Sequence, residues 1–220
     1  MTLKLNGSSS GYTAIDAPAA AGSNTLVLPT TNGSAGQVLT TDGSGNLTWA
    51  NDSGKLLQVV QTKVTAPSDI SCSTAGTFYN IAVLNRTITP ASSSSKILLS
   101  AHVYGEGNNS DEEWHYRIGR SIGGTANQQL AIGDAGGAQT RVTGTFSAGY
   151  GGADSASTPV VFTVPNFLDS PTTTSEITYQ IYVGCQNASK TFYLNKTVND
   201  SDHASYERGA SWVTVMEVAG

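Results

Sequence analysis

The densest group of side chains able to do chemistry lies near the middle of the sequence. An acidic cluster at residues 111–113 is followed directly by Trp114, His115, Tyr116 and Arg117. Aromatic rings stack on the apolar faces of sugars, while Arg and carboxylate groups bind sugar hydroxyls. The group therefore predicts a glycan-binding site that uses Trp114, Tyr116 and Arg117. The alternative is a strand whose aromatic residues alternate between the core and an interface.

Three further residues suggest the same kind of site. Tyr150, Tyr206 and Arg208 lie in long segments rich in Gly, Asn and Ser. Such segments form loops, and binding residues are often found on loops that a rigid scaffold holds in place. We therefore add these three residues to the candidate glycan-binding set.

The sequence offers little support for catalysis. Residues 7–11 read Gly-Ser-Ser-Ser-Gly and satisfy the pattern of a hydrolase nucleophile, but no helix follows them as that turn requires. Glu112 and Glu113 are adjacent, so in a strand they point to opposite faces and do not form a glycosidase pair. We predict that the protein is not an enzyme, with a glycan-modifying activity as a remote alternative.

No metal or cofactor is predicted. The three histidines, His102, His115 and His203, form no H-x-H pair and have no metal-ligand spacing. The acidic residues 111–113 and 200–202 carry the oxygen ligands that calcium prefers, but neither cluster matches an EF-hand. We interpret them as solvated loop charges, with a cation site as the alternative.

Composition excludes several classes of protein. Only 12% of the 220 residues are charged, about half the usual share, and the 11 Lys and Arg residues argue against nucleic-acid binding. The sequence contains no run of about 18 apolar residues, so no membrane insertion is predicted. Residues 1–7 also lack the apolar stretch of a secretory signal. Synthesis in a cytoplasm is therefore expected. Cys72 and Cys185 either pair or remain as small buried residues.

Residues 1–54 form a segment distinct from the rest. Short apolar clusters alternate with dense turn signals such as Asn32-Gly33 and Asp42-Gly43. No cluster is long enough to bury a face by itself. We therefore expect an extended, β-fibrous segment whose copies wind together, each supplying part of a thin core.

Residues 55–220 predict an all-β head domain. Ile177, Tyr179, Ile181 and Val183 alternate with polar residues, which is typical of a half-buried strand. The regular spacing of such runs predicts a β-sandwich, most simply a jelly-roll-like one. The expected strands are 56–64, 77–88, 96–104, 113–122, 139–147, 160–164, 176–185, 191–195 and 211–218. The last is apolar on both faces, which indicates a central strand or burial against another subunit.

Two stretches resemble a known group of proteins. Residues 26–49, from Leu26-Val27-Leu28-Pro29 to Leu47-Thr48-Trp49, are similar to an "LP..NG.AGQ.L.TDG.G.L.W" element of tail-fibre and other fibre proteins of tailed bacteriophages, frequent in marine and cyanobacterial phages. Residues 95–99, 167–175 and 211–218 resemble the β-rich heads of such fibres. The resemblance implies a homotrimer located in the virion.

These observations lead to one hypothesis and its rivals. The N-terminal segment would attach the protein to other virion proteins, of the tail or the capsid, through its apolar residues Leu3, Leu5, Tyr12 and Ile15. The head would bind a host cell-surface component, a glycan or a protein. The first rival is a purely structural virion protein, a capsid-decorating fibre or tail adaptor, without receptor binding. The second, more remote rival is the glycan-modifying enzyme considered above.

Overall fold

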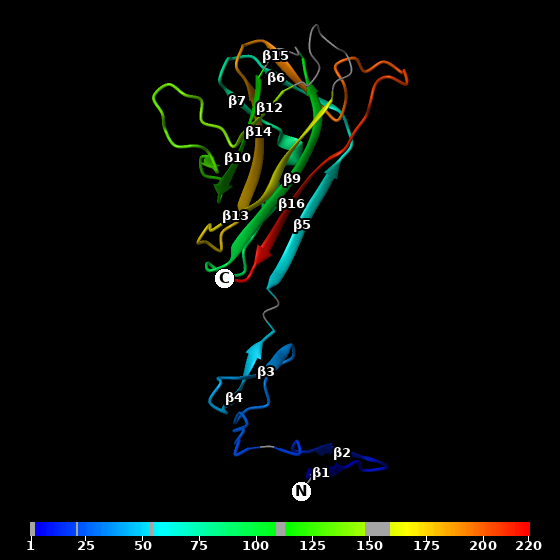
Figure 1. Cartoon of the computed structure of the whole chain (residues 1–220), viewed down its shortest axis with the longest axis vertical. Coiled ribbons are helices and arrows are strands. Elements are labelled where there is room, and N and C mark those ends of the chain that lie inside the picture. Colours follow the sequence, from blue (N-terminus) through cyan, green and yellow to red (C-terminus); the bar gives the residue numbers. More distant parts are fainter. Residues whose placement is uncertain (1–2, 21, 53–54, 109–112, 148–158) are drawn as a thin grey trace. The chain divides into compact units, whose positions relative to one another are not determined.

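The computed structural model describes residues 3–20, 22–52, 55–108, 113–147 and 159–220. The chain divides into two compact units, Met1–Ser53 and Gly54–Gly220. We call the first the N-terminal unit and the second the head (Figure 1). No helix in the described ranges is long and apolar enough to span a membrane.

The N-terminal unit contains two separate antiparallel hairpins. The first pairs β1 (Leu3–Asn6) with β2 (Tyr12–Ile15), and the second pairs β3 (Gln37–Thr41) with β4 (Leu47–Asn51). Asp42 shapes the second turn, because its carboxylate accepts hydrogen bonds from the side chain of Asn46 (2.7 Å) and from the backbone N–H of Ser44 (2.8 Å). The hydrogen bond from Asn46, followed by that from Ser44, lowers the pKa of Asp42.

Trp49 packs its ring against the turn at residues 31–33. Its indole N–H donates to the carbonyl of Thr31 (2.7 Å), and the ring lies over Gly33. Gly33 has a φ of +70°, and a Cβ there would lie 2.6 Å from the indole. The Asn32-Gly33 turn therefore needs glycine for its conformation and for the space.

None of the residues of the N-terminal unit that the structure describes is buried. Its apolar side chains are largely exposed, as at Leu28 (70%), Leu26 (67%) and Ile15 (66%). A unit of about fifty residues has little core to stabilise it even when compact. Contacts within this unit alone therefore leave most of its apolar surface in water.

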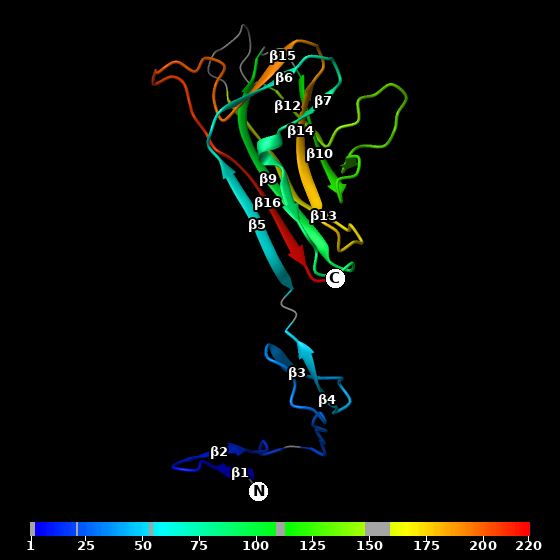
Figure 2. The same ribbon diagram turned by 180° about the vertical axis from the view of Figure 1, so that it is seen from behind.

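The head consists of two antiparallel sheets (Figures 1 and 2). The first, called here the β10 sheet, has the order β11-β10-β14-β7, with β12 on β10 and β8 on β14. Its strands are β7 (Phe78–Asn80), β8 (Arg86–Ile88), β10 (Glu113–Ile122), β11 (Gln128–Leu130), β12 (Gly144–Ser147) and β14 (Ile177–Cys185).

The second sheet, called here the β9 sheet, has the order β5-β16-β9-β15-β6, with β13 on β9. Its strands are β5 (Leu56–Val64), β6 (Ser68–Cys72), β9 (Lys96–Gly107), β13 (Val160–Asp169), β15 (Lys190–Leu194) and β16 (Ser211–Val218). The prediction of an all-β chain with a β-sandwich head is confirmed. β16 is central, between β5 and β9.

Two expected strands are wrong in detail. The expected strand 77–88 is divided by a 3-10 turn, η1 (Ala82–Leu84). Asn80 pairs with Tyr182, and Arg86 pairs with Tyr179. The five residues between Asn80 and Arg86 therefore stand opposite only two residues of β14 and must bulge out of the sheet. The expected strand 139–147 shortens to β12, because the preceding residues form a loop.

The core lies between the two sheets and is rich in aromatic rings. Trp114, fully buried, packs on Phe146 and Phe192 with ring centroids 6.2 and 5.9 Å apart. Gly107 opposes this ring, and a Cβ there would lie 2.1 Å from the indole nitrogen. The alternating residues of β14 (Ile177, Tyr179, Ile181 and Val183) are all buried, which confirms the predicted inward face.

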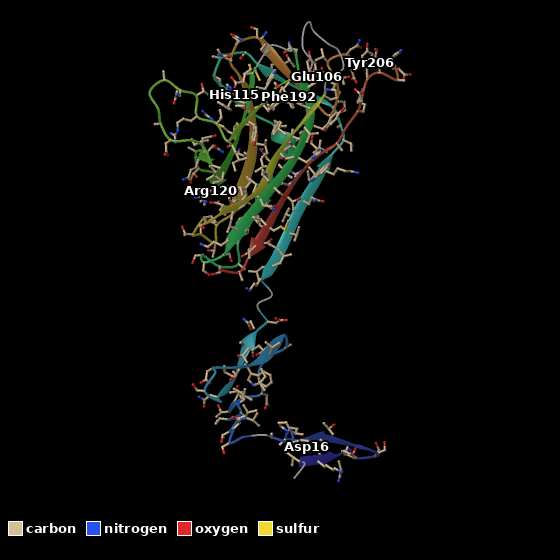
Figure 3. The ribbon with its side chains drawn as sticks, in the orientation of Figure 1. Asp16, Glu106, His115, Arg120, Phe192 and Tyr206 are labelled. Carbon is tan, nitrogen blue, oxygen red and sulfur yellow. The ribbon has the colours of Figure 1, made fainter. Side chains whose placement is uncertain are left out.

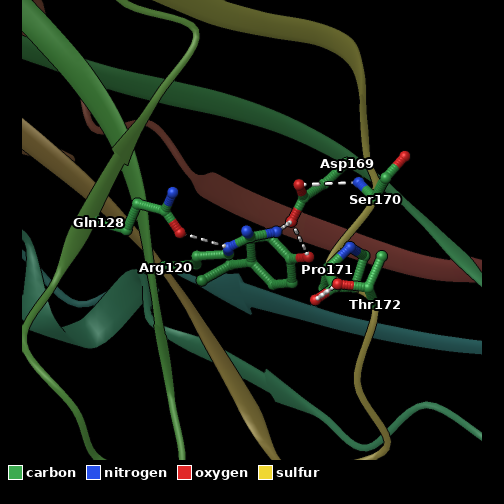
Figure 4. Close-up of polar contacts among 7 residues, drawn as sticks. Arg120, Gln128, Asp169, Ser170, Pro171 and Thr172 are labelled. Atoms are coloured by element: carbon green, nitrogen blue, oxygen red, sulfur yellow. Dashed lines mark hydrogen bonds and ion pairs between the residues drawn. The ribbon is translucent and has the colours of Figure 1, made fainter. Parts of the chain in front are cut away.

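A buried ion pair connects the two sheets (Figure 4). Arg120 of β10 donates from Nη1 to Oδ2 of Asp169 at the end of β13 (2.5 Å). Tyr179 of β14 donates its hydroxyl to the same oxygen (2.7 Å), and the N–H of Ser170 donates to the other (2.8 Å). Burial, followed by the bond to Asp169, raises the pKa of Tyr179. This network compensates the desolvation of both charges.

Two buried glutamates anchor loops to the β9 sheet. Glu106 of β9 accepts a hydrogen bond from the N–H of Val198 (2.7 Å). Glu217 of β16 accepts from the N–H of Ala91 (2.7 Å) and from the amide of Gln58 (2.6 Å). Each carboxylate therefore fixes the path of an irregular segment.

Candidate functional site

Trp114 does not present its ring to a ligand. Strand alternation turns Trp114 inward, where its side chain is fully buried between the sheets. Its neighbour Tyr116 faces the same way, stacks on Phe162 (4.7 Å) and donates its hydroxyl to the carbonyl of Thr163 (3.2 Å). The assignment of Trp114 to a glycan site is therefore wrong. The alternative weighed from the sequence, a strand with core aromatics, describes this segment.

Arg117 lies on the outer face of the β10 sheet. Its guanidinium lies 3.7 Å from the ring centroid of Phe78, and its Nε donates to the carbonyl of Arg141 (2.6 Å). Burial, and then the charge of Arg141, lower the pKa of Arg117. The ring of Phe78 also stacks with that of His115 (6.2 Å). Arg117 is thus held in place by a cation–π contact and a backbone bond.

A polar cleft lies beside this group on β10 and β12, and we call it the β10 cleft. It has a volume of about 530 Å³. It is lined by Glu113, His115, Gln139, Thr140, Val142, Thr145 and Gln186. Glu113 and His115 face it together because they are two positions apart on one strand, with 3.8 Å between carboxylate and imidazole. Nδ1 of His115 is buried and has no hydrogen-bond partner.

Tyr206 and Arg208 are brought together in the loop after β15. They line a pocket of about 310 Å³ with Asp200, Ser201, Asp202, His203 and Glu207, called here the loop pocket. Arg208 donates from Nε to Oδ1 of Asp200 (2.5 Å), and the amide of Asn199 donates to the hydroxyl of Tyr206 (2.9 Å). The loop pocket thus combines an aromatic ring, a guanidinium and carboxylates, the set that binds sugars.

Buried contacts hold the base of the loop pocket. The loop starts at Asn195, which donates to the carbonyl of Val64 (2.9 Å), and it is anchored by the bond from Val198 to Glu106. Tyr104 lies nearby, and burial, then Glu207 and Glu106, raise its pKa to about 12. The pocket is therefore a loop on a rigid scaffold, as binding sites often are.

The two pockets share one end of the head. Figure 3 shows Tyr206 and His115 at one end of the head, and Figure 1, in the same orientation, marks the C-terminus at the other end. The chain enters the head at that opposite end, where the N–H of Ala219 donates to the carbonyl of Lys55 (2.7 Å). Both pockets therefore lie at the end of the head opposite Lys55.

The remaining predicted residues are placed as follows. Tyr150, and the acidic residues 111 and 112, lie outside the described residues. The hairpin of β1 and β2 carries four exposed apolar residues, Leu3, Leu5, Tyr12 and Ile15, each with 56–66% of its surface exposed. Among the residues that the structure describes, no group of three His, Cys, Asp or Glu side chains is arranged to hold a metal ion.

One further surface, the outer face of the β9 sheet, was not among the sites predicted from the sequence. Strand register places Val59, Met216, Leu98 and Leu168 in one row across β5, β16, β9 and β13. Val59 is 52% and Leu168 55% exposed. The two-sided apolar pattern of residues 211–218 was the signal for it.

A second row of this face contains a stacked pair. Trp212 of β16 lies on His102 of β9, with ring centroids 3.8 Å apart and planes within 6°. Burial lowers the pKa of His102, so the imidazole is neutral at pH 7. The outer face of the β9 sheet therefore combines one apolar row with a second row in which Lys63 of β5 and Thr163 of β13 flank the stacked pair.

Comparisons with known proteins give no family. No protein-family model matches the chain, and no curated protein is similar to it in sequence. Among solved structures, infectious bursal disease virus of the Gx strain is similar at a TM-score of 0.35 and 10% identity, over 79% of this chain and 43% of that chain. The VP2 subviral particle of the same virus gives 0.33 and 10%, over the same shares. The chain spans less than half the length of these viral proteins.

Proposed function

We propose that this chain is a non-enzymatic virion surface protein, an oligomeric fibre with a glycan-binding head. The observation that carries the proposal is the absence of any buried residue among the described part of the N-terminal unit. Apolar side chains exposed by 40–70% favour association, because their burial is the main source of stability. Other copies of the same segment supply matching surfaces in equal number. We propose three copies, following the resemblance to trimeric fibres.

The outer face of the β9 sheet supports association of the heads. Four strands spaced about 4.8 Å apart, with eight residues rising about 3.4 Å each, form a face of roughly 19 by 27 Å. Around the threefold axis of the proposed trimer each copy buries at most about 500 Å² of this face, or about 1,500 Å² for the three copies, so the heads supplement the association of the N-terminal segments. The row from Val59 to Leu168 supplies the apolar centre that such an interface needs.

The ligand proposed for the head is a host cell-surface glycan. The loop pocket offers Tyr206 for stacking and Arg208 with Asp200 for hydroxyl groups. A single open site of this kind binds its ligand weakly. Three linked sites bind a surface more tightly, because the first contact raises the effective concentration of ligand at the other two. The N-terminal hairpin with Leu3, Leu5, Tyr12 and Ile15 is proposed to attach the protein to the particle.

An array of bacterial surface glycans tests the binding proposal. The full chain is applied alongside a Tyr206→Ala/Arg208→Ala variant and a Tyr12→Ala control, after light scattering has shown equal oligomeric mass. We expect binding of the wild type and the control and at least tenfold weaker binding of the pocket variant. Equal binding by all three proteins would refute the loop pocket as the site.

A purely structural virion protein is the second candidate. It is favoured by the internal partners of the pocket residues, since Arg208 pairs with Asp200 and Tyr206 bonds to Asn199. This candidate predicts that the chain is found in particles but binds no glycan and no host cell. An antibody against the head would then leave infection unchanged.

A further inference from the structure

We propose that Cys72 and Cys185 are a modification site, at which an intramolecular disulfide bond joins the two sheets of the head. Cys72 is the last residue of β6, in the β9 sheet, and Cys185 is the last residue of β14, in the β10 sheet. Both thiols are reduced in the structure, and both residues are fully buried.

Strand register brings the two residues together. Cys72 pairs with Lys190, which follows Cys185 by five residues along the chain. Gly184 pairs with Phe78, which follows Cys72 by six residues. Two short turns, 73–77 and 186–189, therefore cross between the sheets at one end of the sandwich, and one cysteine begins each crossing.

Several contacts fix this arrangement. The N–H of Gly76 donates to the carbonyl of Cys185 (3.0 Å), so the first turn is bonded to the start of the second. The hydroxyl of Tyr79 bonds to Ser73 and accepts from the N–H of Thr74, both at 2.9 Å. The thiol of Cys185 is within hydrogen-bonding reach of that of Cys72. Bond formation needs a small movement of sulfur atoms rather than a new path of the backbone.

Burial determines when the bond forms. It raises the pKa of Cys72 to about 12, with a further contribution from Cys185. Because the thiolate is the reacting species, exchange in the closed head is slow at neutral pH. Oxidation therefore takes place while the chain folds or when this end of the sandwich opens.

The reaction balances with a small disulfide as the oxidant. One cysteine thiolate attacks oxidised glutathione, forms a mixed disulfide and releases one glutathione thiolate. The second cysteine then attacks the mixed disulfide and releases the second glutathione. Two thiols of the protein are oxidised, one glutathione disulfide is reduced to two thiols, and two protons leave the cysteines.

Refolding provides a direct test. The full chain is denatured, refolded in a buffer of reduced and oxidised glutathione, alkylated and digested with trypsin without reduction. Residues 64–86 contain Cys72 and residues 142–190 contain Cys185, and each range is bounded by tryptic sites. We expect one linked peptide pair, lost on reduction, and a higher urea midpoint for the linked protein than for the reduced one.

Controls separate this result from other oxidation. Cys72→Ser and Cys185→Ser variants must yield no intramolecular link and no redox-dependent shift of the midpoint. A native circular dichroism spectrum with both cysteines alkylated in the wild type would overturn the proposal. So would links between different chains in place of the pair within one chain. The wild-type measurement stands even where a variant fails to fold.

Discussion

The substitution Val59→Asp examines the outer face of the β9 sheet as a contact between copies. Val59 lies in the row that crosses β5, β16, β9 and β13, and 52% of it is exposed. In an isolated chain the new carboxylate would stand in water. Surface changes of this kind usually alter the free energy of unfolding by less than about 0.5 kcal/mol. In the proposed oligomer the same group would be covered by a neighbouring copy.

The expected effect follows from the exposed fraction. Full burial of a valine side chain contributes about 1.5 kcal/mol, so covering the exposed half contributes about 0.8 kcal/mol per copy. The aspartate loses this contribution and must also be desolvated, which costs several kcal/mol unless it is paired. We therefore expect a weakening of association by at least about 2 to 3 kcal/mol per contact, or roughly a hundredfold in the dissociation constant.

Sedimentation of the full chain over a range of concentrations measures this effect. Val83→Asp is the matched control, because Val83 is 47% exposed but lies in η1 and is not part of the row. We expect Val59→Asp to shift the dissociation midpoint strongly and Val83→Asp to leave it unchanged. Equal dissociation constants for both variants and the wild type would refute the role of this face.

Three further predictions concern the core, the acid stability and the N-terminal unit. Asp169→Ala leaves Arg120 and Tyr179 buried without their partner, so we expect a loss of about 3–5 kcal/mol in the free energy of unfolding, measured by urea at a fixed protein concentration. Glu217 is buried, which alone raises its pKa, but the hydrogen bonds it accepts outweigh burial and lower it below the ordinary 4.5. Its contribution is therefore complete above pH 4.5 and lost as the pH falls through the lowered value, so Glu217→Gln should flatten the decline of the urea midpoint in acid. Deletion of residues 1–30 should leave a folded head that no longer enters particles, and incorporation of the deleted chain on immunoblots of purified particles would contradict the attachment hypothesis.

The class of the fold could be predicted from the sequence because alternation is local. The period of two along residues 177–183 identifies both the strand and its buried face, as the burial of Ile177 and Val183 shows. The break in residues 77–88 could not be predicted. It arises because Asn80 and Arg86 pair with positions of β14 only three residues apart, a constraint that lies in the partner strand.

The candidate site was predictable only in part. Trp114 and Arg117 were assigned together by residue type, but they lie on opposite faces of β10. A shift of one residue exchanges the two faces of a strand. Aromatic residues suit both a core and a sugar-binding site, so their types do not determine which face each one occupies. Tyr206 and Arg208 lie in one loop, so their proximity follows from the sequence. The pairing of Arg208 with Asp200 depends on how that loop folds back.

The central claim is that the functional unit is an oligomer whose exposed apolar surfaces cover one another. Light scattering after size-exclusion chromatography of the full chain at micromolar concentration tests it most directly. We expect a single species with three times the mass of the chain, unchanged on moderate dilution. A stable monomer at that concentration, with the N-terminal unit folded, would contradict it.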